Sequence, residues 1–519
     1  MPLESFASRP VCALRIVVVI AATALACGGA PPPTAPAPKP AAIAARVVDQ
    51  VPSDTPYVMA MDQTMLSATT FEMAAARSAI EVGLRAAILS PAAAATASVE
   101  DRLGSEVARE LLPFDDAALR RIGWLPGESE LVVYGHGLLP ILRVRADGRT
   151  ALAAWRRVSA RSGFTLPESS WRGVPYIQIP PSGERTQTIV VAFLPRQVVA
   201  TLAMRPGAVL DHLIDEAPAA DPLMPRWQRA HLDPERPADA WPYLWVNPSA
   251  AAPRLRDGLD LAYLGLGKPP KCRAAMADAA IVLPNLSAMY WRAGDDIVAS
   301  YAVPLPTVWK PLFGEGRAVM HWLADARPGV QLGWRVPADE LVAGIAEIAA
   351  PVRAALRACG EPADDPLANL ASAPLRQLRG GTVTAEVVDG VAAVVISLEA
   401  LDVGALWGWL QRLLPLGAFP RPGEVQAVPL MPGLTLLALA TNREIGLSVG
   451  WPDATRLDAL LASGGHPAAL IVDFDQAALA KARFGGMTLG GDAGVGARMQ
   501  FSIDRRGAIL RVRGRPPVR

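Results

Sequence analysis

The sequence predicts an α+β fold made of two copies of a β-β-α-β-β-α unit, with antiparallel sheets and helices packed on one face of them. Short apolar runs bounded by turn residues alternate with stretches of helical periodicity. The order of these segments over residues 130–214 recurs over residues 382–461. Hydrophobic residues make up 51% of the 519 residues, which supplies enough apolar material for packed cores. We therefore expect a duplicated, multi-domain globular body.

The first copy begins with two apolar strands around the turn Gly135-His136-Gly137. Asp147 or Thr150 can cap the helix that follows, and Gly163 can end it. Two further strands and a second helix complete the copy. We expect strands over residues 130–134, 138–144, 174–179 and 188–203, the last one broken near Pro195, and the second helix over residues 208–214.

The second copy follows the same order. Two short matches support the duplication: ALAAW at 151–155 resembles ALWGW at 405–409, and LDHLI at 210–214 resembles LDALL at 457–461. A chance likeness between helices rich in alanine and leucine is the alternative. A hairpin over residues 286–303 can cover the open face of a sheet. The second copy predicts strands over residues 382–388, 391–398, 425–430 and 434–449, a helix that begins at Asp402, and a helix over residues 454–461.

The N-terminus carries the pattern of an export signal. Residues 16–25 form an uncharged apolar run after Arg9 and Arg15, and this run is too short to span a bilayer. Ala24-Leu25-Ala26-Cys27 follows and resembles the lipobox of bacterial lipoproteins. The resemblance implies that the chain is cut before Cys27 and that fatty acyl chains such as palmitate anchor this residue in the bilayer. An ordinary secretory signal with a chance cysteine is the alternative.

The segment after Cys27 predicts an extended tether and the membrane to which the protein is attached. Residues 28–42 are rich in proline and alanine and favour an extended spacer. No acidic residue directly follows Cys27, which in the lipoprotein resemblance implies outer-membrane attachment, with the body facing the periplasm or the cell surface. The predicted organisation is a signal peptide at 1–26, a tether at 27–42, a first α/β domain at 43–235, a middle segment with a hairpin and helices at 236–375, and a second α/β domain at 376–519.

The start of the body carries a second resemblance. Residues 51–58 read as an opening strand, and within them Pro52-Ser53-Asp54-Thr55-Pro56 is similar to the opening of a family of uncharacterised bacterial envelope proteins with repeated α/β domains. That family has no established activity. The resemblance therefore implies a repeated α/β architecture and no reaction.

The cysteines agree with export. Cys12 leaves with the signal peptide and Cys27 is acylated, so Cys272 and Cys359 remain as a single pair. In an oxidising compartment such a pair predicts a disulfide, and two buried free thiols are the alternative. The chain has no Cys-x-x-Cys, and its five histidines lack metal-ligand spacing. We therefore expect no metal site and no cofactor.

Charge and motifs favour a non-catalytic role. The formal net charge of +1 argues against a nucleic-acid partner. The chain contains no Gly-x-Ser-x-Gly, no Ser-x-x-Lys and no phosphate-binding loop. Asp473 and Asp475, on one face of a strand, are the best carboxylate pair, and His136 is interpreted as a turn residue. Tryptophans at 241 and 245 are interpreted as core residues, with an aromatic binding face as the alternative.

We therefore expect an envelope lipoprotein with a binding or structural role. Its partners would be the bilayer, through acylated Cys27, and an unknown protein, glycan or lipid. Two alternatives stay open. One is an envelope hydrolase or transferase whose site is assembled from dispersed residues. The other is a lipid carrier with an internal apolar cavity.

Overall fold

A computed structural model gives the architecture of the body, and the chain divides into two compact units, residues 1–230 with 241–282, and residues 231–240 with 283–519. Of the predicted middle segment 236–375, residues 241–282 thus belong to the first unit, and residues 236–240 and 283–375 belong to the second. The structure describes residues 46–62, 99–112, 116–125, 130–163, 167–181, 187–203, 207–264, 267–294, 296–305, 320–323, 328–362, 378–388, 391–431, 434–451, 453–463, 465–466, 468–475, 483–484, 487–488 and 497–514. The predicted signal peptide, Cys27 and the tether lie outside these residues.

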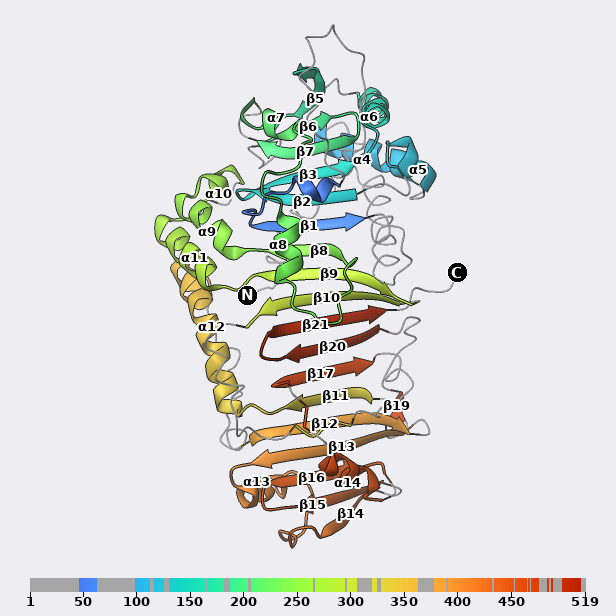
Figure 1. Ribbon diagram of the computed structural model, residues 1–519, viewed down its shortest axis with the longest axis vertical. Helices are drawn as coiled ribbons and strands as arrows, with labels where there is room; N and C mark the ends of the chain where they lie inside the picture. The colour runs from blue at the N-terminus through green and yellow to red at the C-terminus, as the bar shows by residue number, and fades with distance from the viewer. Residues whose placement is uncertain are drawn as a thin grey trace. The chain divides into compact units, whose positions relative to one another are not determined.

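The first unit is built on an antiparallel sheet with the strand order β8-β1-β2-β3-β7-β6-β5-β4 (Figure 1). Its strands are β1 (Tyr57–Asp62), β2 (Glu130–His136), β3 (Leu139–Arg145), β4 (Glu168–Trp171), β5 (Val174–Ile179), β6 (Thr188–Phe193), β7 (Gln197–Ala203) and β8 (Trp241–Val246). Its helices are η1 (Val47–Gln50), α4 (Val99–Leu111), α5 (Asp116–Arg121), α6 (Gly148–Ser162), α7 (Gly207–Leu213), α8 (Leu223–Ala230), α9 (Pro248–Asp257), α10 (Leu259–Tyr263) and α11 (Pro270–Val282).

The second unit contains a longer antiparallel sheet with the strand order β9-β10-β21-β20-β17-β11-β12-β13-β16-β15-β14 (Figure 1). Its strands are β9 (Leu286–Ala293), β10 (Asp296–Pro304), β11 (Pro328–Trp334), β12 (Leu378–Val388), β13 (Val391–Ala400), β14 (Val425–Met431), β15 (Leu434–Ala440), β16 (Glu444–Val449), β17 (Leu470–Asp475), β18 (Arg483–Phe484), β19 (Met487–Thr488), β20 (Ala497–Ile503) and β21 (Gly507–Gly514). Its helices are α12 (Ala338–Ala358), α13 (Val403–Leu410) and α14 (Thr455–Ala462).

The α+β class with antiparallel sheets is confirmed, and the local signals explain why the elements form where they do. The side chain of Asp147 accepts hydrogen bonds from the first amides of α6, and Gly163 ends this helix in the left-handed conformation with φ 72°. Asp402 caps α13 in the same way. The predicted hairpin at 286–303 corresponds to β9 and β10.

Two predicted boundaries were wrong. The stretch 434–449, expected as one strand, forms β15 and β16, which pair with each other. The chain reverses between them because the amide of Thr441 donates to the carbonyl of Glu444 at 2.8 Å. By contrast, the predicted break near Pro195 is confirmed, because β6 ends before this residue, β7 begins after it, and the two strands pair with each other. The opening strand begins at Tyr57 rather than at residue 51.

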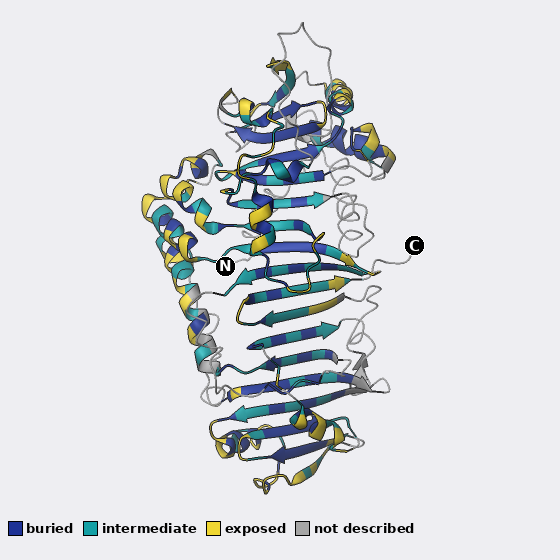
Figure 2. Cartoon of the chain, viewed as in Figure 1, coloured by how far each residue is buried: buried dark blue, intermediate teal, exposed yellow. Residues whose placement is uncertain are grey.

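Helices pack on both faces of β3 in the first unit and of β13 in the second unit, rather than on the single face that we predicted. Trp155 of α6 packs with Leu142 and Val144 of β3, whereas Arg143, which points to the opposite face, bonds the end of α7. In the second unit, α13 packs on residues 396 and 398 of β13, and α14 packs on residue 395. Figure 2 shows the result most clearly in β7, which is buried along its whole length. A strand with both faces covered reads as a continuous apolar run.

Cys272 and Cys359 are disulfide-bonded, as the cysteine count predicted. Cys272 is buried in α11, and Cys359 directly follows α12. Among the helices in the described ranges, none is long and apolar enough to cross a membrane.

Candidate functional site

One polar cluster of the first unit lies where the β2–β3 hairpin meets the end of α7. We call it the Arg143 cluster, and it comprises Tyr134, His136, Arg143, Gln197 and His212. Tyr134 and Arg143 are almost fully buried, with 0% and 1% of their surface exposed, whereas His136 is exposed. The cluster therefore connects the interior of the unit with its surface.

Arg143 fastens the end of α7 to the sheet. Its Nη2 donates to the carbonyl of His212 at 2.8 Å, and its Nη1 donates to the carbonyl of Asp215 at 3.1 Å. A further bond from Nη1 reaches the Leu213 carbonyl at 3.4 Å. The last carbonyls of a helix lack partners within the helix and carry partial negative charge, so a guanidinium is a favourable cap there.

Tyr134 connects Arg143 with His212. Arg143 can only donate, so the hydroxyl of Tyr134 accepts from its Nε at 3.2 Å. The same hydroxyl lies 3.0 Å from His212 Nε2, and it can donate its hydrogen to this nitrogen when His212 is neutral with its proton on Nδ1. Burial, with smaller contributions from His136 and Arg143, lowers the pKa of His212 to about 4.

His136 closes the cluster at the surface. Its ring stacks on that of His212 with centroids 4.5 Å apart, and the partial burial of this ring, together with Arg254, lowers the pKa of His136. The turn beside it is held by the amide of Leu138, which donates to Asp260 Oδ2 at 2.8 Å. Gly137 has φ 62°, and a Cβ there would clash with Asp260, which explains the glycine. A neutral, exposed imidazole can accept a proton or a hydrogen bond from a ligand.

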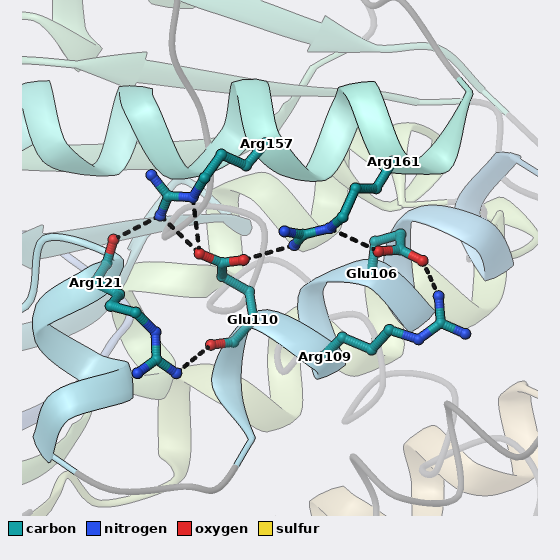
Figure 3. Close-up of polar contacts among 6 residues, drawn as sticks. All are labelled: Glu106, Arg109, Glu110, Arg121, Arg157 and Arg161. Atoms are coloured by element: carbon teal, nitrogen blue, oxygen red, sulfur yellow. Dashed lines mark hydrogen bonds and ion pairs between the residues drawn. The ribbon is translucent and has the colours of Figure 1, made fainter.

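A second cluster joins α4 to α6 (Figure 3). Glu110 Oε1 lies 2.6 Å from Arg157 Nη2, and its Oε2 lies 2.6 Å from Arg161 Nη2. Glu106 binds Arg161 Nε at 2.9 Å and also pairs with Arg109. Burial opposes ionisation of Glu110, but the bonds from Arg161 and Arg157 outweigh it and lower its pKa. These basic side chains of α6 are therefore engaged within the unit.

The second unit uses ion pairs in the same way. His321 Nε2 lies 3.1 Å from Glu444 Oε2, and His321 Nδ1 lies 3.2 Å from the carbonyl of Ser463. Because both ring nitrogens face acceptors, the charged imidazolium is favoured, and the bond to Glu444 raises the pKa of His321 against the effect of burial. Ser397 donates to the same carboxylate oxygen of Glu444 at 3.2 Å.

Residues 231–240 form a strap that belongs to the second unit. Its Asp233, with a fully buried side chain, lies 2.6 Å from Arg511 Nη2 and 2.7 Å from Arg511 Nε. Ser300 donates to Asp233 Oδ2 at 2.6 Å. Despite burial, the bonds from Arg511 and Ser300 lower the pKa of Asp233. The pair holds the strap to β10 and β21.

The residues singled out from the sequence are engaged within the fold. Asp473 is buried and paired with Arg498, whose Nε lies 2.8 Å from Asp473 Oδ1. Asp475 lies opposite Arg498 in the pairing of β17 with β20. Trp245 is fully buried, while Trp241 lies under the guanidinium of Arg46 at 4.1 Å. Within the described part of the chain, no group of three or more histidine, cysteine, aspartate or glutamate side chains could hold a metal ion.

Sequence reasoning identified His136 only as a turn residue and missed Arg143 and His212. The one available signal was an arginine inside the apolar strand LPILRVR. Comparisons with known families, with curated proteins and with solved structures find no significant match to this chain.

Proposed function

We propose that the chain is an exported lipoprotein of the bacterial envelope, anchored in the outer membrane through acylated Cys27, with a non-catalytic binding or structural role. The bonded pair Cys272 and Cys359 is the observation that carries this proposal. Disulfides form and persist in oxidising compartments and are rare in the cytosol. A bilayer is then one partner, and an envelope protein, glycan or lipid is the other.

The polar clusters support a structural use of the body. Arg143 binds α7 to β3, Glu110 binds α4 to α6, and Asp233 binds the strap to β10 and β21. In each cluster the buried charge meets a carbonyl or an opposite charge of the same unit. Such contacts rigidify the scaffold on which a binding surface can be displayed.

We also propose that each unit contains a copy of one β-β-α-β-β-β-α element, to which the first unit adds the strand β4. The strand order β1-β2-β3-β7-β6-β5 parallels the order β11-β12-β13-β16-β15-β14. The register agrees as well, because Arg145 lies opposite Gln197 as Glu399 lies opposite Glu444. Each of the two strand orders is extended at its first strand, because β8 pairs with β1 in the first unit and β17 pairs with β11 in the second.

Metabolic labelling tests the anchor. The full chain is expressed in a bacterial host with an alkyne analogue of palmitate, and membrane fractions are probed for the label. Wild type should be labelled and sediment with outer membranes, and Cys27→Ser should lose both properties. Cys12→Ser is the matched control and should keep them, because residue 12 leaves with the signal peptide. Equal labelling of wild type and Cys27→Ser would overturn the proposal.

A further inference from the structure

The strand β14 forms an open edge of the sheet in the second unit (Figure 1). Among the described residues it pairs with β15 alone. An edge strand presents unpaired N–H and C=O groups to any chain that can align with it, and native proteins usually guard such edges with charged side chains. β14 contains no charged residue, and Val425, Ala427 and Pro429 are exposed on it. Only its far end is guarded, by Pro429 and the register shift that follows it.

The corresponding edge of the first unit is covered by a further strand. In the strand order and register of the first unit, Tyr176 of β5 occupies the place that Val425 of β14 occupies in the second. β4 covers Tyr176 through Ser169 in antiparallel pairing. The residues that β4 itself exposes, Glu168, Ser169 and Ser170, are polar. The fold thus accommodates one more antiparallel strand beside this edge, and no described strand takes that place in the second unit.

The backbone groups on the open side of β14 belong to Val425 and Ala427. Proline has no N–H, and within sheets it occupies positions where its nitrogen faces away from the ladder. Alternate residues of an antiparallel strand direct their N–H and C=O groups to the same side. Val425 and Ala427 alternate with Gln426 and share the orientation of Pro429, so their N–H and C=O groups point away from β15.

A second copy of β14 complements this edge. A two-fold axis beside Gln426 places Val425 of one copy opposite Ala427 of the other, and each such pair can exchange both of its backbone hydrogen bonds. The exposed side chains of these residues then form apolar cross-strand pairs. Glu424 falls opposite Val428, so no like charges face each other in this register.

Pairing with a second copy also leaves no new edge open. A two-fold contact uses the same surface on both partners and closes after two copies, whereas a single partner strand would present its own outer edge to further chains. The loop after α13 adds apolar surface beside β14. Gln426 Nε2 donates to the carbonyl of Ala418 at 2.7 Å, which holds this loop against the strand, and the neighbouring Phe419 is 44% exposed.

We propose that the protein forms a two-fold dimer in which the β14 edges of two copies pair with each other in antiparallel orientation. The dimer extends the sheet of the second unit from one copy into the next. The proposal concerns the edge of this sheet and is independent of the lipid anchor. Its failure and the failure of the proposed function are therefore read in different experiments.

Sedimentation equilibrium of the full chain in a density-matched detergent counts the copies. Wild type should show the mass of two copies, and Ala427→Lys, which brings like charges together at the paired edge, should weaken association at least about tenfold. Ser169→Lys is the matched control, because it places the same charge on the exposed β4 and should leave the dimer intact. A wild type that remains a single copy up to about 100 μM would overturn the proposal. Association that persists unchanged in Ala427→Lys would overturn it as well, because the contact would then lie elsewhere.

Hydrogen exchange of wild type tests the same contact without any substitution. The amides of Val425 and Ala427 should exchange more slowly in concentrated than in dilute protein, because pairing with the second copy protects them. In Ala427→Lys this dependence on concentration should disappear, while the rest of the second unit exchanges as in wild type. Exchange that is independent of concentration in wild type would overturn the proposal. Slow exchange of these amides in a single copy would show that another segment or another protein covers the edge, and it would refute the dimer.

Discussion

Replacing Arg143 with methionine should release the end of α7 from the sheet. Methionine keeps the apolar stem but removes the guanidinium, which leaves the Tyr134 hydroxyl and the carbonyls of His212 and Asp215 without their donor. Charge-assisted bonds contribute about 1.5–3 kcal/mol each when both partners are shielded. Because the carbonyls at the helix end can regain water in the variant, we expect a total loss of about 3 kcal/mol. This corresponds to an increase of about 150-fold in opening of the helix.

Hydrogen exchange read by mass spectrometry localises this effect. Amides of α7 (Gly207–Leu213) should exchange up to about 150-fold faster in Arg143→Met than in wild type. Arg149→Met is the matched control, because Arg149 is exposed at the start of α6 and its loss should leave α7 unchanged. Exchange of α7 that is equal in Arg143→Met and Arg149→Met would refute the capping role, and a uniform increase over the whole unit would refute its local character.

Three further predictions concern ion pairs and the disulfide. Glu110→Gln should lower the free energy of unfolding in urea by about 1–2 kcal/mol, because the arginine partners of Glu110 are partly exposed. Glu168→Gln should lower it by less than about 0.5 kcal/mol, because the side chains of Glu168 and Arg156 are 31% and 42% exposed. Equal losses in the two variants would contradict this ranking. Because the pKa of His321 is raised in the folded state, its ion pair with Glu444 stabilises the protein fully below about pH 6.5, and this stabilisation is lost as the pH rises through the folded pKa. The difference in the free energy of unfolding between wild type and His321→Gln should therefore shrink from about pH 5.5 to about pH 9. A constant difference would count against the ion pair of His321 with Glu444. The oxidised mature body should migrate faster than the reduced one in a denaturing gel, and Cys359→Ser should abolish that difference; its persistence would exclude the pair.

Local signals made much of the secondary structure predictable. The hairpin of β2 and β3, the cap at Asp147 and the stop at Gly163 each depend on a few neighbouring residues, and the structure has them where the sequence places them. The reversal between β15 and β16 was missed because residues 441–444, which connect the two apolar runs, include neither glycine nor proline. Strand length therefore remained ambiguous in that stretch.

The candidate site was hardly predictable, because its contacts are long-range. Arg143 and the carbonyl of His212 are 69 residues apart, and Tyr134 and His212 are 78 apart. Periodicity assigns a residue to a face of a strand, but it does not show which distant helix end will cover that face. The prediction that helices pack on a single face of the sheet failed for the same reason. The helices α6 and α7 pack on opposite faces of β3, and helical periodicity does not show on which face of a sheet a helix will pack.

The Asp233–Arg511 pair has a consequence for biogenesis. Its partners are 278 residues apart in the sequence. Asp233 is synthesised long before Arg511, so a nascent or prematurely terminated polypeptide contains the carboxylate of Asp233 without its guanidinium partner. Burying that lone charge is strongly unfavourable. The strap should therefore stay undocked until residue 511 has been synthesised, and a product that is truncated before residue 511 would remain open to proteases.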